Sequence, residues 1–432
     1  MDRLELDLGI MLRIILLHLL LLPGLLLPQD GAGPEIPIIL EHADSIVGKG
    51  AFESSVRTFY GNVRFQQGNV TGRCDRAIHN TSANVVELFG NVVIMQGALT
   101  MRAPEVRYNG NRYLAVAPKG VRVEQRGQIV DARKGEYSTT SHIAKFYGDV
   151  VMRDDTTRIN GDTMVVDRDA DTMVAVGNVV GFDSTDNAWF ESDRARRDAT
   201  SGELMLVGNA QMWNWDDDAD VDTLYVSADT LYAIRSEQNA SRSMDARGRA
   251  SMIRGNTSAR AGSITYTDVS QELTLRDQPY VWSDSMAFAA GAITATMPAR
   301  RLESIMGVGK AILISKVPTI QTERYDQIAG DVIDLAFEQD SLRSILARGS
   351  AQSVTFRGEG SEQDGLAKVA CDSIRAAFDQ GQLSDVFWLG GIAGEHHPEQ
   401  LVTGREQQFL LPSFQWRSDR PVRRRPRTQI LR

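Results

Sequence analysis

The sequence predicts an all-β protein built from about eleven two-stranded repeats of about 29 residues. Three observations lead to this prediction. One seven-residue phrase recurs along the chain, its copies are evenly spaced, and the apolar residues around each copy alternate with polar ones. Alternation with a period of two is typical of a strand that buries one face. Helical periodicity is nearly absent, so an all-β array is expected.

The recurring phrase reads FYGNVRF at 59–65 and returns as LFGNVVI at 88–94, FYGDVVM at 146–152, AVGNVVG at 175–181 and LVGNAQM at 206–212. Its third residue defines eleven anchors, at intervals of 29, 29, 29, 29, 31, 40, 29, 32, 40 and 41 residues. The longer intervals are expected to hold loop insertions, as repeat arrays permit. The anchors are Gly61, Gly90, Lys119, Gly148, Gly177, Gly208, Gly248, Asp277, Gly309, Gly349 and Gly390.

The Gly-Asn or Gly-Asp pair, present at five of the eleven anchors, has a structural interpretation. Glycine within a strand permits a bulge, a sharp bend or a close backbone approach. Its recurrence therefore predicts a corner at the same edge of every repeat. The alternative is a ligand motif used many times.

The second half of each repeat is also strand-like. An acidic residue leads into alternating apolar positions, a polar turn such as RDAD (168–171) follows, and a second strand runs into the next anchor. Two strands per repeat would build two facing sheets, on the order of 50 Å long at a strand spacing of ~4.8 Å. Their inner faces form either a packed core or an apolar groove suited to acyl chains.

Apolar side chains at alternate positions around the anchors are expected to face this interior. The candidates to line a lipid groove are Phe59, Val63, Phe65, Leu88, Val92, Ile94, Phe146, Val150, Met152 and Val179. A stack of strands also leaves an unpaired edge at each end, which needs a cover or recruits another chain. The proline-containing segments 33–40 and 420–427 are candidate covers.

The N-terminus predicts export. Arg13 precedes the apolar run 14–27, which Pro23 interrupts and a polar stretch follows, so residues 1–32 are interpreted as a signal peptide. The alternative is a retained membrane anchor, although the run is short for ~30 Å of hydrocarbon. No cysteine stands directly after the run, which argues against a lipoprotein.

Charge and cysteine content exclude some classes. A formal net charge of −9, from 47 basic and 56 acidic side chains, argues against a nucleic-acid-binding protein. Cys74 and Cys371 occupy corresponding places in distant repeats. An intramolecular disulfide needs Cα atoms within ~7 Å, so we expect free or intermolecularly paired thiols.

The remaining acidic and histidine clusters do not support a metal-binding or catalytic role. Asp218, Asp220 and Asp222 have calcium-loop spacing, but Thr223 stands where that loop needs glycine, so a solvated loop is expected. His396 and His397 have no further ligand at a defined spacing, and a polar loop is expected there. No motif supports a catalytic nucleophile. We predict no enzyme, no metal site and no cofactor.

The C-terminal segment 396–432 is the basic, Pro- and Arg-rich part of the chain. A charged tail of this kind is usually disordered, and disorder is the prediction. The alternative is that its arginines bind phosphates of lipid A or another anionic lipid.

The segment LEHADSIVG (40–48), together with F-Y-G-N-V and C-D elements at the 29-residue period, resembles the OstA-like (organic-solvent-tolerance A) proteins, the family of periplasmic lipopolysaccharide-transport protein A. The likeness spans roughly residues 37–395. It implies an elongated, twisted β-jellyroll, with a first half at 37–210 and a continuation at 211–395. It also implies a groove that shields the acyl chains of lipid A.

This resemblance implies a non-enzymatic lipopolysaccharide transport or bridge protein that contributes to outer-membrane assembly. Its place would be the periplasm, either free or associated with the outer or inner membrane. Its partners would be other jellyroll proteins of this transport system, joined end to end by strand addition, or further copies of itself. The alternative is a structural or interaction β-solenoid with a packed core and no lipid ligand.

Overall fold

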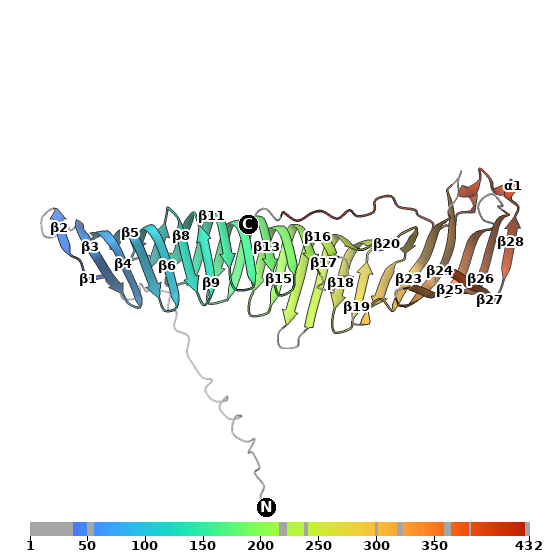
Figure 1. Ribbon diagram of the computed structural model, residues 1–432, viewed down its shortest axis with the longest axis horizontal. Coiled ribbons are helices and arrows are strands. Elements are labelled where there is room, and N and C mark those ends of the chain that lie inside the picture. The colour runs from blue at the N-terminus through green and yellow to red at the C-terminus, as the bar shows by residue number, and fades with distance from the viewer. Residues whose placement is uncertain are drawn as a thin grey trace, which may run out of the picture.

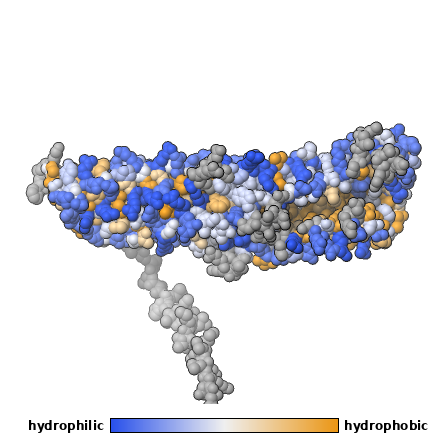
Figure 2. Space-filling model, in the orientation of Figure 1, coloured by the Kyte–Doolittle hydropathy of each residue, from blue (hydrophilic) through white to orange (hydrophobic). Residues whose placement is uncertain are grey.

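The computed structural model describes residues 38–49, 56–215, 223–236, 241–298, 301–317, 323–339, 341–357, 364–379 and 382–427. Figure 1 shows one long, twisted array in which antiparallel strands lie side by side across the long axis, and Figure 2 shows the same elongated shape in a space-filling view. The predicted all-β class is confirmed. Within the described residues, no helix is long and apolar enough to cross a bilayer. The predicted signal segment lies outside them.

The strands follow one another in chain order. The first are β1 (Ile39–His42), β2 (Ser45–Lys49), β3 (Val56–Gln67), β4 (Val70–Asn80), β5 (Val85–Gln96), β6 (Leu99–Asn109), β7 (Leu114–Ala117), β8 (Val121–Gln125), β9 (Gln128–Ala132) and β10 (Lys134–Ser138). The middle of the array holds β11 (Ile143–Arg153), β12 (Thr157–Asp167), β13 (Thr172–Asp183), β14 (Ala188–Asp198), β15 (Glu203–Asn214), β16 (Leu224–Ser236), β17 (Ser241–Arg254) and β18 (Thr257–Thr267). The last are β19 (Glu272–Arg276), β20 (Tyr280–Ser283), β21 (Met286–Ala289), β22 (Ala292–Thr296), β23 (Ser304–Val317), β24 (Arg324–Glu338), β25 (Ser341–Arg357), β26 (Gly365–Asp379), β27 (Gln382–Leu389) and β28 (Ala393–His397).

The number of layers agrees with eleven repeats. Six layers consist of two short strands each, so the 28 strands form 22 layers. The predicted length is wrong. Both strands of a repeat lie in the same sheet, so each repeat adds two spacings, and 22 layers span about 100 Å at ~4.8 Å each.

Each long strand continues through its anchor and bends there. In β3 the pairing register with β4 shifts between Tyr60 and Val63. We call the side of Val56–Tyr60 wall A and the side of Val63–Gln67 wall B. The two facing sheets of the prediction are therefore two halves of one sheet, folded along the row of anchors.

At Gly177, specific backbone angles and one side-chain hydrogen bond form the predicted corner. Gly177 and Asn178 both have positive φ, 80° and 47°. The Asn178 side chain donates to Asp162 Oδ2 at 2.9 Å, and a Cβ on Gly177 would lie 2.3 Å from that oxygen. An acidic residue in the middle of the preceding strand, β12, thus holds the bend. The same Asp–Gly–Asn arrangement occurs at Gly61, Gly90 and Gly208.

Gly177→Ala is expected to lower the free energy of unfolding by about 1–3 kcal/mol, because the new Cβ meets both a left-handed backbone and the Asp162 carboxylate. Urea unfolding followed by circular dichroism measures this loss. Gly161→Ala in the neighbouring strand is the control, since its Cβ would meet nothing closer than 3.5 Å. Equal losses in the two variants would contradict the structural role of the anchor.

The two cysteines are free and buried. Each thiol donates to the carbonyl two residues ahead, Cys74 to Arg76 and Cys371 to Ser373, both at 3.2 Å. They therefore occupy equivalent places, as predicted, on β4 and β26. Eighteen layer spacings separate these strands, roughly 85 Å. Burial raises the pKa of the Cys74 thiol to about 11, so it stays protonated at neutral pH.

Two predicted loops have different outcomes. Asp218, Asp220 and Asp222, the candidates for the calcium loop, lie outside the described residues. Asp229, farther along the chain, holds the bend at Gly248 and pairs with Arg249. The loop predicted at His396 and His397 is wrong, because both belong to β28 and pair with β26. Across the described part of the chain, no group of three His, Cys, Asp or Glu side chains could hold a metal ion.

The prediction of a disordered tail is wrong for residues 398–427. After β28 the chain forms α1 (Glu399–Val402) and a 3-10 turn (Glu406–Phe409), then returns in extended form along the array. Figure 1 shows this return as a dark red trace that passes β20 toward β13. We call residues 399–427 the C-terminal strap.

The strap covers the outer face of wall B. At its start, the guanidinium of Arg324, 2% exposed, lies 2.6 Å from Glu399 and 3.4 Å from Glu406. Farther along, the indole N–H groups of Trp282 and Trp213 donate to strap carbonyls at 2.9 and 2.8 Å.

This outer face is apolar where the strap lies. Trp213 follows the interior Met212, and Val180, Trp189, Tyr225 and Ile253 form a buried cluster with it. Wall B is thus apolar on both faces here, and the strap protects the outer one from water.

Candidate functional site

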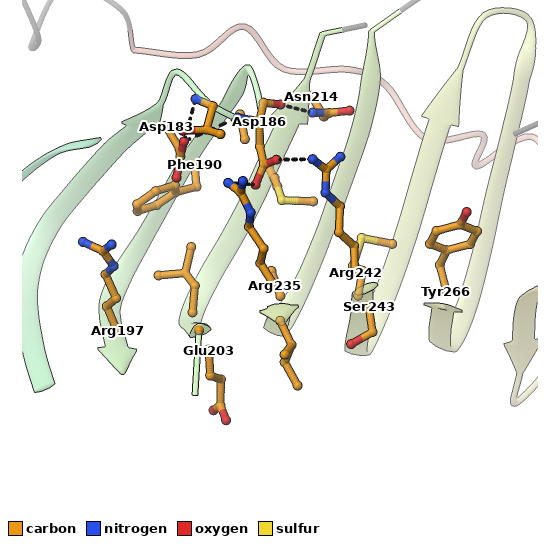
Figure 3. Close-up of a pocket in the computed structure, with 18 of the residues that line it drawn as sticks. Asp183, Asp186, Phe190, Arg197, Glu203, Asn214, Arg235, Arg242, Ser243 and Tyr266 are labelled. Carbon is orange, nitrogen blue, oxygen red and sulfur yellow. Dashed lines mark hydrogen bonds and ion pairs between the residues drawn. The ribbon is translucent and has the colours of Figure 1, made fainter. Parts of the chain in front are cut away.

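An apolar cavity of about 780 Å³ lies between the two walls in the middle of the array, from β12 to β19 (Figure 3). The side chains that line it project from alternate positions of bent strands. Wall B contributes Ile159, Phe190, Met212, Leu224 and Met252, and wall A contributes Leu204, Met244, Tyr266 and Leu273. A cavity of this size and character is typical of a site for an apolar ligand.

Charged side chains join the walls at the cavity mouth. Asp186, in the turn after β13, lies 2.8 Å from Arg242 and 3.5 Å from Arg235. Both arginines extend toward it from wall A (Figure 3). Asp154 pairs with Arg197 at 3.4 Å in the same way. The site therefore combines an apolar interior with an ionic mouth.

Burial alone would raise the pKa of Asp154, but hydrogen bonds from the backbone of Thr156 and Thr157, together with Arg197, hold that pKa below its usual value. The carboxylate is therefore ionised at neutral pH. It can keep its pair with Arg197 across the mouth.

The cavity lies where interior residues beside the bend become small. The second residue after the anchor is valine in the first repeats and alanine farther on. The valines are Val63, Val92, Val150 and Val179, and the alanines are Ala210, Ala250, Ala311 and Ala351. All eight are at most 1% exposed. Because alanine lacks two methyl groups of valine, the later repeats leave more space between the walls.

The ten predicted groove residues lie in a packed interior. Phe59, Val63, Phe65, Leu88, Val92, Ile94, Phe146, Val150, Met152 and Val179 are at most 3% exposed and belong to one continuous core. None of the ten is among the described residues that line the cavity. Their role as lipid contacts stays a prediction.

The first repeats are also closed at the mouth. Tyr137 Oη on wall A donates to Gln96 Oε1 on wall B at 2.7 Å, and Gln96 Nε2 donates to the carbonyl of Thr139 at 3.3 Å. Both arrangements that the sequence left open therefore occur. The first repeats are packed, and the middle of the array is hollow.

Sequence reasoning missed the cavity residues although the repeat contained their signal. Met212 and Met252 stand four residues after anchors Gly208 and Gly248. The predicted residues Phe65, Ile94 and Met152 occupy the same place in earlier repeats. Counting four residues from each later anchor, across the longer intervals, identifies both methionines.

One interior carboxyl gives the array a pH dependence. Burial raises the pKa of Asp326 to about 6, against the weaker opposing effect of a hydrogen bond from the Phe356 N–H. The contribution of Asp326 to the stability of the folded state therefore falls as pH rises from about 4, where the unfolded carboxyl ionises, to about 6, and this loss persists above that.

Asp326→Asn is accordingly expected to raise the free energy of unfolding by about 1–3 kcal/mol at pH 8 and to leave it nearly unchanged at pH 4. The asparagine amide oxygen can still accept the bond from Phe356. Urea unfolding at the two pH values measures the difference. A gain that is independent of pH would contradict the raised pKa.

Two family models match the first part of the chain. Residues 35–156 match the model of the OstA-like protein. Residues 129–225 match the model described as LptA/(LptD N-terminal domain) LPS transport protein. Over residues 35–225 the chain is therefore similar to OstA-like and lipopolysaccharide-transport proteins.

The segment that the two models match runs from β1 to the start of β16 and contains all ten predicted groove residues. Beyond it, the bent strands and anchors continue to β27. A search of curated proteins finds no significant match. Among solved structures, the chain is similar to LptH, the LptA homologous periplasmic component of the lipopolysaccharide transport device from Pseudomonas aeruginosa. The identity is 15%, over 42% of this chain and 82% of LptH, with a TM-score of 0.14.

Proposed function

We propose that this protein is a non-enzymatic, periplasmic lipopolysaccharide-transport or bridge protein that contributes to outer-membrane assembly. It shields acyl chains of lipid A between its two walls. The observation that carries this proposal is the apolar cavity with an ionic mouth in the middle of the array. The two family matches support the ligand class.

Apolar burial supplies the driving force. Each CH₂ group transferred from water contributes about 0.8 kcal/mol, so eight buried groups would contribute roughly 6 kcal/mol. The pairs that Asp186 forms with Arg235 and Arg242 keep charge at the water-facing mouth. An amphipathic ligand would place its acyl chain inside and its polar headgroup at this rim.

The free edges support end-to-end assembly. Within the described chain, β2 pairs only with β3, and β27 pairs only with β26. Ile46 at one end is 57% exposed, and Phe387 and Leu389 at the other are each 50% exposed. Strand addition at these ends would join the protein to related jellyroll modules or to further copies of itself.

Site-specific photo-crosslinking tests the ligand proposal. A benzophenone amino acid at Leu204, which lines the cavity, is expected to crosslink to lipopolysaccharide in cells that make it. The same group at Met205, the next residue on β15, points out of the interior and is the matched control. Crosslinking of similar yield at both positions would show that no interior site exists. It would then favour the alternative of a structural β-solenoid without a lipid ligand.

A further inference from the structure

A row of arginines crosses the outer face of wall B in the first repeats. Direct strand pairing places Arg64 opposite Arg73, Arg73 opposite Val93, Val93 opposite Arg102, and Arg102 opposite Arg122. We call Arg64, Arg73, Arg102 and Arg122 the arginine ladder. It crosses five strands and so spans roughly 19 Å. All four arginines border a shallow surface hollow of about 1110 Å³.

The ladder is not explained by folding stability. Like charges directly opposite each other on neighbouring strands destabilise a sheet, and the ladder contains two such pairs, Arg64 with Arg73 and Arg102 with Arg122. Arg122 is compensated by Glu124 at 2.7 Å and Asp131 at 3.6 Å. The side chains of Arg64, Arg73 and Arg102 are exposed and form no ion pair or hydrogen bond with other described residues.

The same face of wall B carries an extended peptide farther along. Pairing continues the ladder row from Asp131 through Val151, Asn160 and Val180 to Glu191. Glu191 accepts a bond from Arg427 Nε of the strap at 2.7 Å. The outer face thus already holds one chain that crosses its strands, and the ladder lies on the continuation of that path.

We infer that the arginine ladder is a docking site for an extended acidic segment of a partner protein. Arginine is suited to carboxylates, because its planar donors can hold both oxygens. The strap itself carries Arg420, Arg423 and Arg427 along this face, and like charge would repel it from the ladder. Charge complementarity therefore requires a partner of opposite sign.

The shape of the patch favours a peptide over a membrane surface. The ladder is one residue wide. The next row on the same face consists of Gln66, Thr71, Met95, Thr100 and Glu124, with no basic residue. The whole chain carries a net charge of −9. A membrane surface attracts proteins through a broad basic face, whereas a narrow row suits a single chain.

Fluorescence anisotropy with the full chain tests the inference. The probe is a fluorescein-labelled eight-residue peptide of alternating Glu and Val, which extends about 26 Å and so covers the ladder. Binding should weaken as salt is added. The double variant Arg73→Gln/Arg102→Gln should weaken it at least tenfold. Arg107→Gln, an exposed arginine of β6 on wall A, is the matched control and should change affinity less than twofold.

Three outcomes would overturn the inference. A peptide of alternating Gln and Val could bind as tightly as the Glu-Val peptide. The Arg107→Gln control could weaken binding as much as the double variant. Vesicles containing phosphatidylglycerol could bind the chain in a ladder-dependent way while the peptide does not, which would assign the patch to a membrane surface. Because the substituted arginines are exposed, an unchanged unfolding midpoint would verify that every variant is folded.

Discussion

Ending the chain after Pro398, which removes the C-terminal strap, is expected to cost several kcal/mol of stability. Arg324 would lose its ion pairs with both Glu399 and Glu406. A hydrogen bond between charged groups contributes about 1.5–3 kcal/mol. The aromatic outer face around Trp213 and Trp282 would also meet water. The measurements are a lowered thermal midpoint, a red shift of tryptophan emission, and binding of a hydrophobic dye.

Two controls make this expectation specific to the strap. A chain that ends at Arg427 keeps every strap contact described above and should behave as the full chain does. A synthetic peptide of residues 399–427 should bind the truncated chain and restore its tryptophan emission. If the truncated chain keeps the thermal midpoint of the full chain, the strap does not stabilise wall B.

Introducing lysines at the last edge is expected to abolish end-to-end association. Phe387→Lys/Leu389→Lys replaces two half-exposed apolar side chains on β27 with charges, and charged edge strands resist strand addition. The unmodified chain is expected to form concentration-dependent oligomers in sedimentation velocity. The double variant should associate at least ~10–100-fold more weakly, corresponding to about 1.4–2.8 kcal/mol.

The repeat supplies a matched control for the edge. Met306 and Val308 occupy the same two places relative to anchor Gly309, and they are 40% and 44% exposed. Their strand, β23, has neighbours on both sides. Met306→Lys/Val308→Lys should therefore leave association unchanged. An unmodified chain that stays monomeric at all concentrations would contradict self-association through these ends.

Much of the fold could be predicted from the sequence because the repeat is local. The anchors predicted a bend, and Gly61, Gly90, Gly177 and Gly208 each form one with an aspartate of the preceding layer. Even anchor Asp277, which is not glycine, has a positive φ of 64°. The length was underestimated because local spacing does not reveal whether two strands lie in one sheet or in two.

The candidate site was harder to predict. Alternation identified which residues face inward, as the buried Val92 and Phe146 show. It could not distinguish a packed interior from a cavity, because inward residues look alike in both. That distinction depends on side-chain volumes summed across two walls, and it becomes visible only when Ala210 and Ala250 are placed opposite their neighbours.

The sequence by itself determined the repeat, its alternation and the bend, since each depends on residues close along the chain. Tertiary structure alone decided where the strap lies. Its contact with Trp213 joins residues 211 positions apart, and such pairings leave no periodic signal. The apolar outer positions around Trp213 and Trp282 were a local trace of that cover. The arginine ladder arises in the same way, because Arg64, Arg73, Arg102 and Arg122 become neighbours only when strand pairing sets the register.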